Sequence, residues 1–179
     1  MRIISGKYRK KTIFPPKNFK ARPTTDVAKE SLFNIIENEY DIPDIKVLDL
    51  FGGTGSISYE FASRECKDIT CVELNFNHYN FIKKTIVELN INDVIHITKA
   101  NVFRYLKKCP HSFDLIFADP PYDINNIDTI PELVFSNNLL NANGTLIIEH
   151  SKNTNLSESI NYIKTKRYGS VNFSFFKIS

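Results

Sequence analysis

The chain has 179 residues, of which 42% are hydrophobic and 24% charged, an ordinary balance for a globular protein of one domain, or of one domain with a small appendage. No apolar run approaches the roughly 18 residues that span a bilayer, and the first residues lack the apolar stretch of a signal peptide, so we expect a cytoplasmic protein. The three cysteines and four histidines show no metal-ligand spacing, so we expect reduced thiols, structural or surface histidines and no bound metal.

Basic charge is concentrated at the N-terminal end. Eight Lys and Arg residues and no acid fall within residues 1–22, so this segment carries +8 and, because the whole chain carries +3, the remainder carries −5. The stretch RIISGKYRKKTIFPP has apolar residues on both sides of a Ser-Gly turn, which predicts a small ordered hairpin. An ordered basic hairpin suits a phosphate backbone, whereas a flexible solubilising tail is the alternative interpretation.

The following elements alternate between helix and strand. RPTTDVAKESLFNIIENEY predicts a helix opened by Pro23 and capped by Thr24, Thr25 or Asp26. Apolar strands then follow, separated by helical segments after Ser56, at 76–89, at 102–108 and at 130–135; the strands are KVLDLF, ITCVEL, VIHIT, DLIFAD and GTLIIEH. Strands that are apolar throughout and separated by helices predict an α/β protein with a mainly parallel sheet covered on both faces.

The end of the chain, INYIKTKRYGSVNFSFFKI, predicts two antiparallel strands around Gly169 that close one edge of this sheet. The predicted organisation is a basic hairpin and helix as an appendage over residues 1–43, followed by the main domain over residues 44–179.

Glycines localise a binding site. Three of the six glycines fall in DLFGGTGS, between the first sheet strand and a helix, where a ligand can approach the main chain closely. Asp49 precedes this loop, and Glu73 ends the next strand, where a carboxylate suits a ribose diol. Because the loop matches neither G-x-G-x-x-G nor a P-loop, we expect a nucleoside without phosphates, such as S-adenosylmethionine. A buried tight turn is the alternative.

The stretch LIFADPPYDI ends an apolar strand with an acid, two prolines and an aromatic ring. An Asp-Pro turn after a strand is the structural interpretation of such a tetrapeptide. Its place at the fourth strand's end, beside a cofactor loop, favours a catalytic one. The candidate catalytic residues are Asp119, Pro120, Pro121 and Tyr122.

In their order and spacing, VLDLFGGTGSIS, CVELN and IFADPPY resemble the cofactor loop, ribose-binding acid and catalytic tetrapeptide of class I S-adenosylmethionine-dependent amino-methyltransferases. The N-terminal RIISGKYRKKTIFPP and ARPTTDVAKESLFNII, with KRYGSVNF near the C-terminus, are similar to the RsmD family. Its members are bacterial enzymes that methylate the exocyclic N2 amine of one guanine in 16S ribosomal RNA. The resemblance covers nearly the whole chain. It implies a Rossmann-like fold, S-adenosylmethionine as cofactor, and 16S rRNA within an assembling small ribosomal subunit as partner of a monomeric enzyme.

The resemblance also implies residue roles. The implied cofactor-binding residues are Asp49, Phe51, Gly52, Gly53, Gly55, Glu73, Leu74, Asn101, Val102 and Asp119. Related enzymes commonly carry Asp where this chain has Asn101, so that residue is either an adenine contact or a helix cap. The candidate RNA-binding residues of the basic segment, given by its charge, are Arg2, Lys7, Arg9, Lys10, Lys11 and Arg22. The resemblance favours a site role for Thr24 or Thr25 beside Arg22, and the alternative for both threonines is helix capping.

An exocyclic amine on a purine is a poor nucleophile, because its lone pair is delocalised into the ring. Acceptors from the Asp119 carboxylate and the Pro120 carbonyl would direct that lone pair at the sulfonium methyl, and Tyr122 would stack on the flipped-out base. Glu149 ends its strand and either lies near the pocket floor or only terminates the strand.

Two other functions use the same motifs. A DNA or protein-glutamine amino-methyltransferase shares the tetrapeptide, but 179 residues hold no inserted target-recognition domain, and Asp rather than Asn heads the motif. A non-catalytic RNA-binding module would need a damaged loop or tetrapeptide, and both are intact.

Overall fold

The computed structural model describes residues 1–17, 19, 25–121, 124 and 126–178. Its centre is a seven-stranded sheet with the order β3-β2-β1-β4-β5-β7-β6, in which the first five strands run parallel and β7 and β6 are antiparallel to their neighbours. The strands are β1 (Lys46–Leu50), β2 (Asp68–Glu73), β3 (Ile95–Lys99), β4 (Phe113–Ala118), β5 (Leu140–Ser151), β6 (Tyr162–Tyr168) and β7 (Val171–Lys177).

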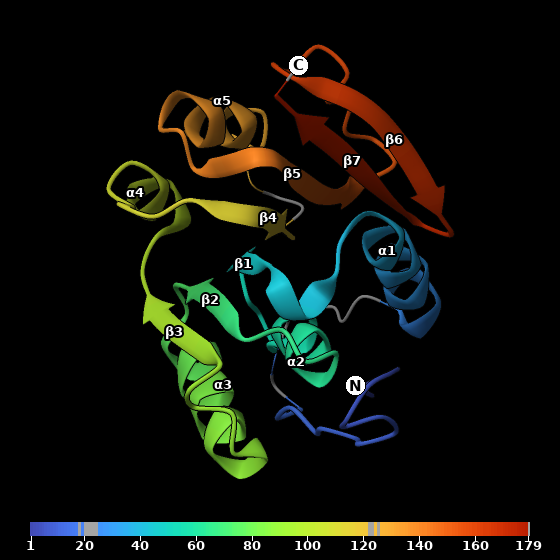
Figure 1. Cartoon of the computed structure of the whole chain (residues 1–179), viewed down its shortest axis with the longest axis vertical. Helices are drawn as coiled ribbons and strands as arrows, with labels where there is room; N and C mark the ends of the chain where they lie inside the picture. Colours follow the sequence, from blue (N-terminus) through green and yellow to red (C-terminus); the bar gives the residue numbers. More distant parts are fainter. Residues whose placement is uncertain (18, 20–24, 122–123, 125, 179) are drawn as a thin grey trace.

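Helices cover both faces of this sheet (Figure 1). They are α1 (Asp26–Glu39), α2 (Ser56–Ser63), α3 (Phe76–Leu89), α4 (Val102–Leu106) and α5 (Thr129–Ser136), with a short 3-10 turn at Ile42–Asp44. Alternate residues of each strand point to opposite faces, so Val47 packs with α1, α2 and α3, whereas Leu48 packs with α4 and α5. The expected mainly parallel sheet with a C-terminal antiparallel hairpin is therefore confirmed. No helix among the described residues is long and apolar enough to cross a membrane.

Element boundaries differ from the sequence prediction mainly at β5. This strand begins at Leu140 rather than at Gly144, because Phe113 pairs with Leu140 before an irregularity shifts the register to Leu115 and Thr145. The polar stretch NANG therefore belongs to the strand although its composition is typical of a turn. Thr25 caps α1, since its hydroxyl accepts a hydrogen bond from the N–H of Ala28 at 3.2 Å.

The N-terminal hairpin is ordered and packed. Arg2 and Thr12 form one isolated antiparallel bridge rather than two full strands, and the turn takes up residues 5–10 rather than a tight Ser-Gly pair. Ile3 and Ile13 are buried in the hydrophobic cluster that contains α1, α2 and α3, and the segment lies beside α2 (dark blue in Figure 1). The division into units at residue 43 stays a prediction.

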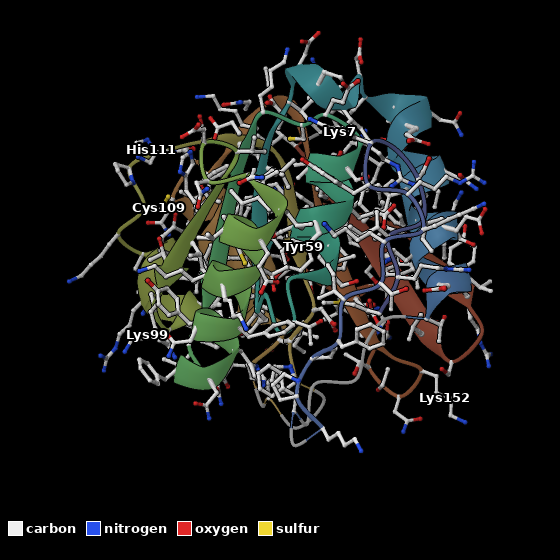
Figure 2. The ribbon with its side chains drawn as sticks, turned by 90° about the horizontal axis from the view of Figure 1, so that it is seen from below. Lys7, Tyr59, Lys99, Cys109, His111 and Lys152 are labelled. Atoms are coloured by element: carbon white, nitrogen blue, oxygen red, sulfur yellow. The ribbon has the colours of Figure 1, made fainter. Side chains whose placement is uncertain are left out.

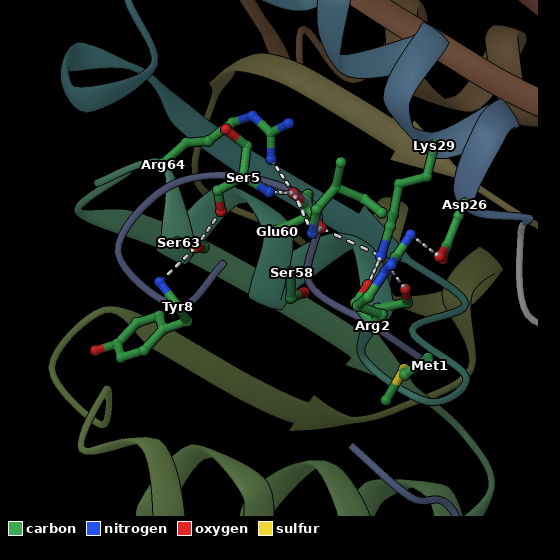
Figure 3. A network of polar contacts seen from close by, with 12 residues as sticks. Met1, Arg2, Ser5, Tyr8, Asp26, Lys29, Ser58, Glu60, Ser63 and Arg64 are labelled. Atoms are coloured by element: carbon green, nitrogen blue, oxygen red, sulfur yellow. Dashed lines mark hydrogen bonds and ion pairs between the residues drawn. The ribbon is translucent and has the colours of Figure 1, made fainter. Parts of the chain in front are cut away.

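A buried carboxylate holds this segment in place (Figure 3). Glu60 of α2, which is fully buried, accepts hydrogen bonds from the N–H groups of Ile4 and Ser5, each at 3.0 Å. Its oxygens also pair with Lys29 Nζ of α1 at 3.2 Å and with Arg64. Because a buried charge is tolerated only when it is paired and hydrogen-bonded, these contacts form one unit.

Lys29 completes the unit from the other side. Its ammonium donates to the Arg2 carbonyl at 2.6 Å and to the Ser56 hydroxyl at 3.2 Å, and its side chain is only 2% exposed. The hairpin, α1 and the first residue of α2 thus share a single buried cation.

We expect Lys29→Met to lower the free energy of unfolding by about 3 kcal/mol or more, because it leaves part of the Glu60 charge and the Arg2 carbonyl buried without this partner. Urea unfolding measures the loss. Lys84→Met is the control, since Lys84 forms an exposed pair with Glu88 at 3.6 Å that should be worth about 0.5 kcal/mol or less. Equal losses in the two variants would contradict the structural role of the buried pair.

Candidate active site

A pocket of about 780 Å³ opens at the edge where the parallel strands end. The strand order reverses between β1 and β4, and ligands of open α/β sheets bind at such a switch point. Most of the residues implicated by sequence line it, namely Asp49, Phe51, Gly52, Gly53, Glu73, Leu74, Asn101, Val102, Asp119, Pro120 and Pro121. Tyr122, Arg22 and Thr24 lie outside the described residues.

Gly52 and Gly55 shape the loop between β1 and α2. A Cβ on Gly52 would lie 2.4 Å from the sulfur of Cys71, so only glycine allows the loop to pass this close to β2. Gly55 is absent from the pocket lining; it is the N-cap of α2 with a φ of 80°, and a Cβ there would lie 2.5 Å from the Tyr59 ring. Gly55 therefore supports the loop from behind rather than facing the pocket.

Glu73, at the end of β2, is held by the main chain. One carboxylate oxygen accepts from the Gly53 N–H at 2.7 Å, and the other accepts from the Asn75 N–H at 2.6 Å. The residue is 7% exposed and lines the pocket. Because each carboxylate oxygen has a second lone pair, Glu73 is oriented by the loop and can still accept hydrogen bonds from a ligand.

Asp49 lies beneath the loop and is 2% exposed. Its carboxyl accepts from the hydroxyl of Ser58 at 2.5 Å and from the N–H of Ser58 at 3.1 Å. Burial raises the pKa of Asp49 to about 7, the Ser58 hydrogen bonds oppose that rise, and the nearby charge of Glu73 adds to it. Asp49 is therefore an acid whose charge changes near neutral pH.

Asp119 follows β4 and lines the pocket together with Glu149. Burial raises the pKa of Asp119 well above its usual range, and the charges of Glu149 and Asp49 raise it further. Four carboxyl groups therefore line one pocket, those of Asp49, Glu73, Asp119 and Glu149. Such a site disfavours phosphates and favours a ligand that carries positive charge and hydroxyl groups.

Asn101 and Thr25 both cap helices and line the pocket. The amide oxygen of Asn101 accepts a hydrogen bond from the N–H of Arg104 at 3.1 Å at the start of α4. The Thr25 hydroxyl accepts a corresponding hydrogen bond from the N–H of Ala28 at the start of α1. The capping interpretation of Asn101 is therefore confirmed, and the adenine contact stays a prediction.

Several pocket residues were not proposed from the sequence, among them His78, Ser170 and Val171. His78 was expected at a structural or surface position, but it lines the pocket, with its Nδ1 4.0 Å from the Glu73 carboxylate. The Phe19 ring packs on the His78 ring, with 4.4 Å between the ring centroids and an angle of 43° between the planes. Ser170 and Val171 come from the β6–β7 turn. No local motif marks these two residues, because the antiparallel return of β7 brings them to the site. Among the described residues, no cluster of His, Cys, Asp and Glu could hold a metal ion.

The basic N-terminal loop lies away from the pocket. The Lys7 N–H donates to the Ser63 carbonyl at 2.7 Å, at the end of α2, whereas the pocket lies at the start of α2. An eight-residue helix spans about 12 Å. Figure 2 shows Lys7 at the opposite end of the molecule from Lys99 and Lys152, which mark the ends of β3 and β5.

The other cations proposed to contact RNA, among the residues that the structure describes, have surface positions. Lys7, Arg9 and Lys10 are exposed in the hairpin turn, Lys11 is exposed directly after it, and Arg2 pairs with Asp26 at 3.0 Å. None of the five cations Arg2, Lys7, Arg9, Lys10 and Lys11 lines the pocket.

Comparison with known proteins supports a methyltransferase fold. The model of a family described as "Conserved hypothetical protein 95" matches residues 1–177. The chain is 34% identical to ribosomal RNA small subunit methyltransferase D of Buchnera aphidicola, over 98% of this chain and 91% of that one. It is 31% identical to the protein of that name from Haemophilus influenzae, over 99% and 93%.

Solved structures have the same fold. A putative methylase from Haemophilus influenzae superposes with a TM-score of 0.80 at 29% identity, covering 98% of this chain and 96% of that one. The putative methyltransferase yhhF from Escherichia coli has a TM-score of 0.84 at 24% identity over the same shares, a likeness of fold alone.

The raised pKa of Asp49 predicts a pH-dependent loss of stability. An unfolded aspartate has a pKa near 3.9, so between about pH 4 and 7 the unfolded chain has released a proton that the folded chain retains. The contribution of Asp49 to folding therefore becomes less favourable as pH rises through this window and is constant above it. We expect Asp49→Asn to gain stability relative to the parent across the same window.

Urea unfolding of the ligand-free protein between pH 4 and 8 tests this expectation, with Asp93→Asn, a change at an exposed site, as control. A difference between parent and Asp49→Asn that does not vary with pH would contradict it.

Proposed function

We propose that this chain transfers a methyl group from S-adenosylmethionine to the N2 amine of a guanine in 16S rRNA. The chain belongs to the Conserved hypothetical protein 95 family, which is the family of ribosomal RNA small subunit methyltransferase D. Family membership supports rRNA methylation. The observation that carries the chemistry is the placement of Glu73 and Asp119 on one acidic pocket at the switch point of the sheet. The N2 position rests on the resemblance of the N-terminal and catalytic motifs. We place the reaction in the cytoplasm, on an assembling small subunit.

The pocket suits S-adenosylmethionine in size and charge. Its volume of about 780 Å³ lies in the range of sites that enclose drug-sized ligands. Glu73, fixed by two backbone N–H groups, would accept hydrogen bonds from the ribose hydroxyls, and Asp49 would face the amino-acid end. When bound, the cofactor supplies an electrophilic methyl on a cationic sulfonium. The surrounding carboxyl groups compensate that positive charge.

The protein contributes orientation and proton acceptance to the transfer. Asp119 and the Pro120 carbonyl would accept the N–H bonds of the amine and direct its lone pair at the methyl carbon. A methylated amine must lose one proton, and the Asp119 carboxylate would accept it. Burial favours protonated Asp119 in the empty pocket, and a bound cation would favour its ionised form. Tyr122 would stack on the flipped-out base.

We expect Glu73→Ala to weaken S-adenosylmethionine binding by about tenfold or more, because charged hydrogen-bond acceptors for the ribose are removed. Isothermal titration calorimetry measures the change. Glu65→Ala, at an exposed position after α2, is the control. Unchanged affinity in Glu73→Ala would refute the assignment of the ribose site.

We expect Asp119→Asn to reduce methyl transfer by about 100-fold or more while S-adenosylmethionine binding persists, since Asp119 acts on the amine. Mass spectrometry of nucleosides from small-subunit rRNA treated with the protein measures the product. The parent should form N2-methylguanosine. Formation of another methylated nucleoside would overturn the proposed position, and near-normal turnover in Asp119→Asn would overturn the orienting role.

A further inference from the structure

The β6–β7 hairpin forms one wall of the pocket. Ser170 and Val171, at the turn and the start of β7, line the same cavity as Asp119 and Pro121. Val171 pairs with Ser151, the last residue of β5. The antiparallel pairing therefore returns the turn to the edge where the parallel strands end.

Cations dominate this hairpin. Residues 162–177 contain four Lys and Arg residues and no acid. Lys164 and Lys177 lie 4.0 and 2.8 Å from the carboxylate of Glu39 in α1. Lys166 and Arg167, nearer the turn, are exposed and form no ion pair within the described part of the chain. Lys152 is exposed and directly follows Ser151, which pairs with Val171 at the start of β7.

The turn itself is open to a large partner. Gly169 has a φ of 60°, and a Cβ there would meet no atom within 4 Å. The Arg167 guanidinium donates to the Gly169 carbonyl at 3.3 Å, which holds it beside the turn and leaves its other N–H groups for a ligand. The cationic side chains of Lys152, Lys166 and Arg167 beside the pocket are therefore exposed to solvent, whereas the pocket interior is acidic.

The base and the phosphates of an RNA substrate need surfaces of different charge. A base can enter the acidic pocket, but its flanking phosphates are repelled there and need cations at the rim. The N-terminal cations Lys7 to Lys11 lie at the far end of α2 and so would contact a more distant part of the RNA.

We propose that Lys152, Lys166 and Arg167 bind the RNA phosphates that flank the target nucleotide and thereby seat its base in the pocket. This inference rests on the proposed function and adds its substrate-positioning surface. Lysines on an edge strand also prevent edge-to-edge pairing of sheets, which is the competing explanation for Lys166. If Lys166 serves only to prevent such pairing, replacing it should leave RNA binding unchanged.

The test compares two double charge reversals of equal size. Lys166→Glu with Arg167→Glu alters the rim. Lys107→Glu with Lys108→Glu alters two exposed cations that follow α4. They precede the start of β4, at the ends of the strands that lie away from the pocket. Because both variants change the net charge equally, a general decrease in attraction to RNA affects both, and only a local effect distinguishes them.

We expect the rim variant to raise the KM for small-subunit RNA about tenfold or more relative to the Lys107/Lys108 variant, with S-adenosylmethionine affinity unchanged by calorimetry. A plot of the logarithm of the RNA-binding constant against the logarithm of the salt concentration should become less steep by about 1.5 units of slope. Two phosphates would no longer be neutralised, and each contributes roughly 0.7 to 0.9 to the slope. Lys166→Gln with Arg167→Gln should show an intermediate effect and guards against misfolding of the reversed variant.

Equal behaviour of the two double reversals would overturn the inference, as would a rim variant that self-associates but binds RNA normally. So would a binding defect confined to Arg9→Glu, Lys10→Glu and Lys11→Glu, which would place all phosphate contacts at the N-terminal loop. Failure of the proposed function is separate, because the parent itself would then form no N2-methylguanosine.

Discussion

The buried carboxylate of Glu60 connects three parts of the chain that are distant in sequence. It binds the main chain of the N-terminal hairpin, Lys29 of α1 and Arg64 at the end of α2. Lys29 in turn contacts Ser56, where α2 leaves the glycine loop. A charge in this position must keep all its partners, so the hairpin cannot shift without disturbing the helix beneath the loop.

The same helix separates the basic loop from the pocket. α2 begins beside Asp49 and Glu73 and ends where Ser63 binds the hairpin turn. The positive segment is thus held at one edge of the sheet and the acidic cavity at the other. A substrate that uses both must extend along the molecule, which agrees with a large RNA rather than a small acceptor.

Much of the fold and part of the site could be predicted from local patterns. Residues 76–89 show an apolar face with helical periodicity, and α3 has these bounds. Asp49, Glu73 and Asp119 could be identified because each lies at or next to the end of an apolar strand, and parallel strands end on the same side of the sheet. His78 and the β6–β7 turn could not, because neither belongs to a local motif and their place depends on packing of α3 and pairing of β7 with β5.

The sequence by itself determined the order of helices and strands, the glycine loop and the acids at strand ends, because these depend on side chains a few residues apart. Only the tertiary structure decided where the cations lie. The basic turn of the hairpin lies at the far end of α2 because Glu60 and Ser63 bind its backbone, and Lys166 and Arg167 lie beside the pocket because β7 returns antiparallel along β5. Both outcomes depend on contacts between residues 20 or more positions apart, which no local pattern specifies.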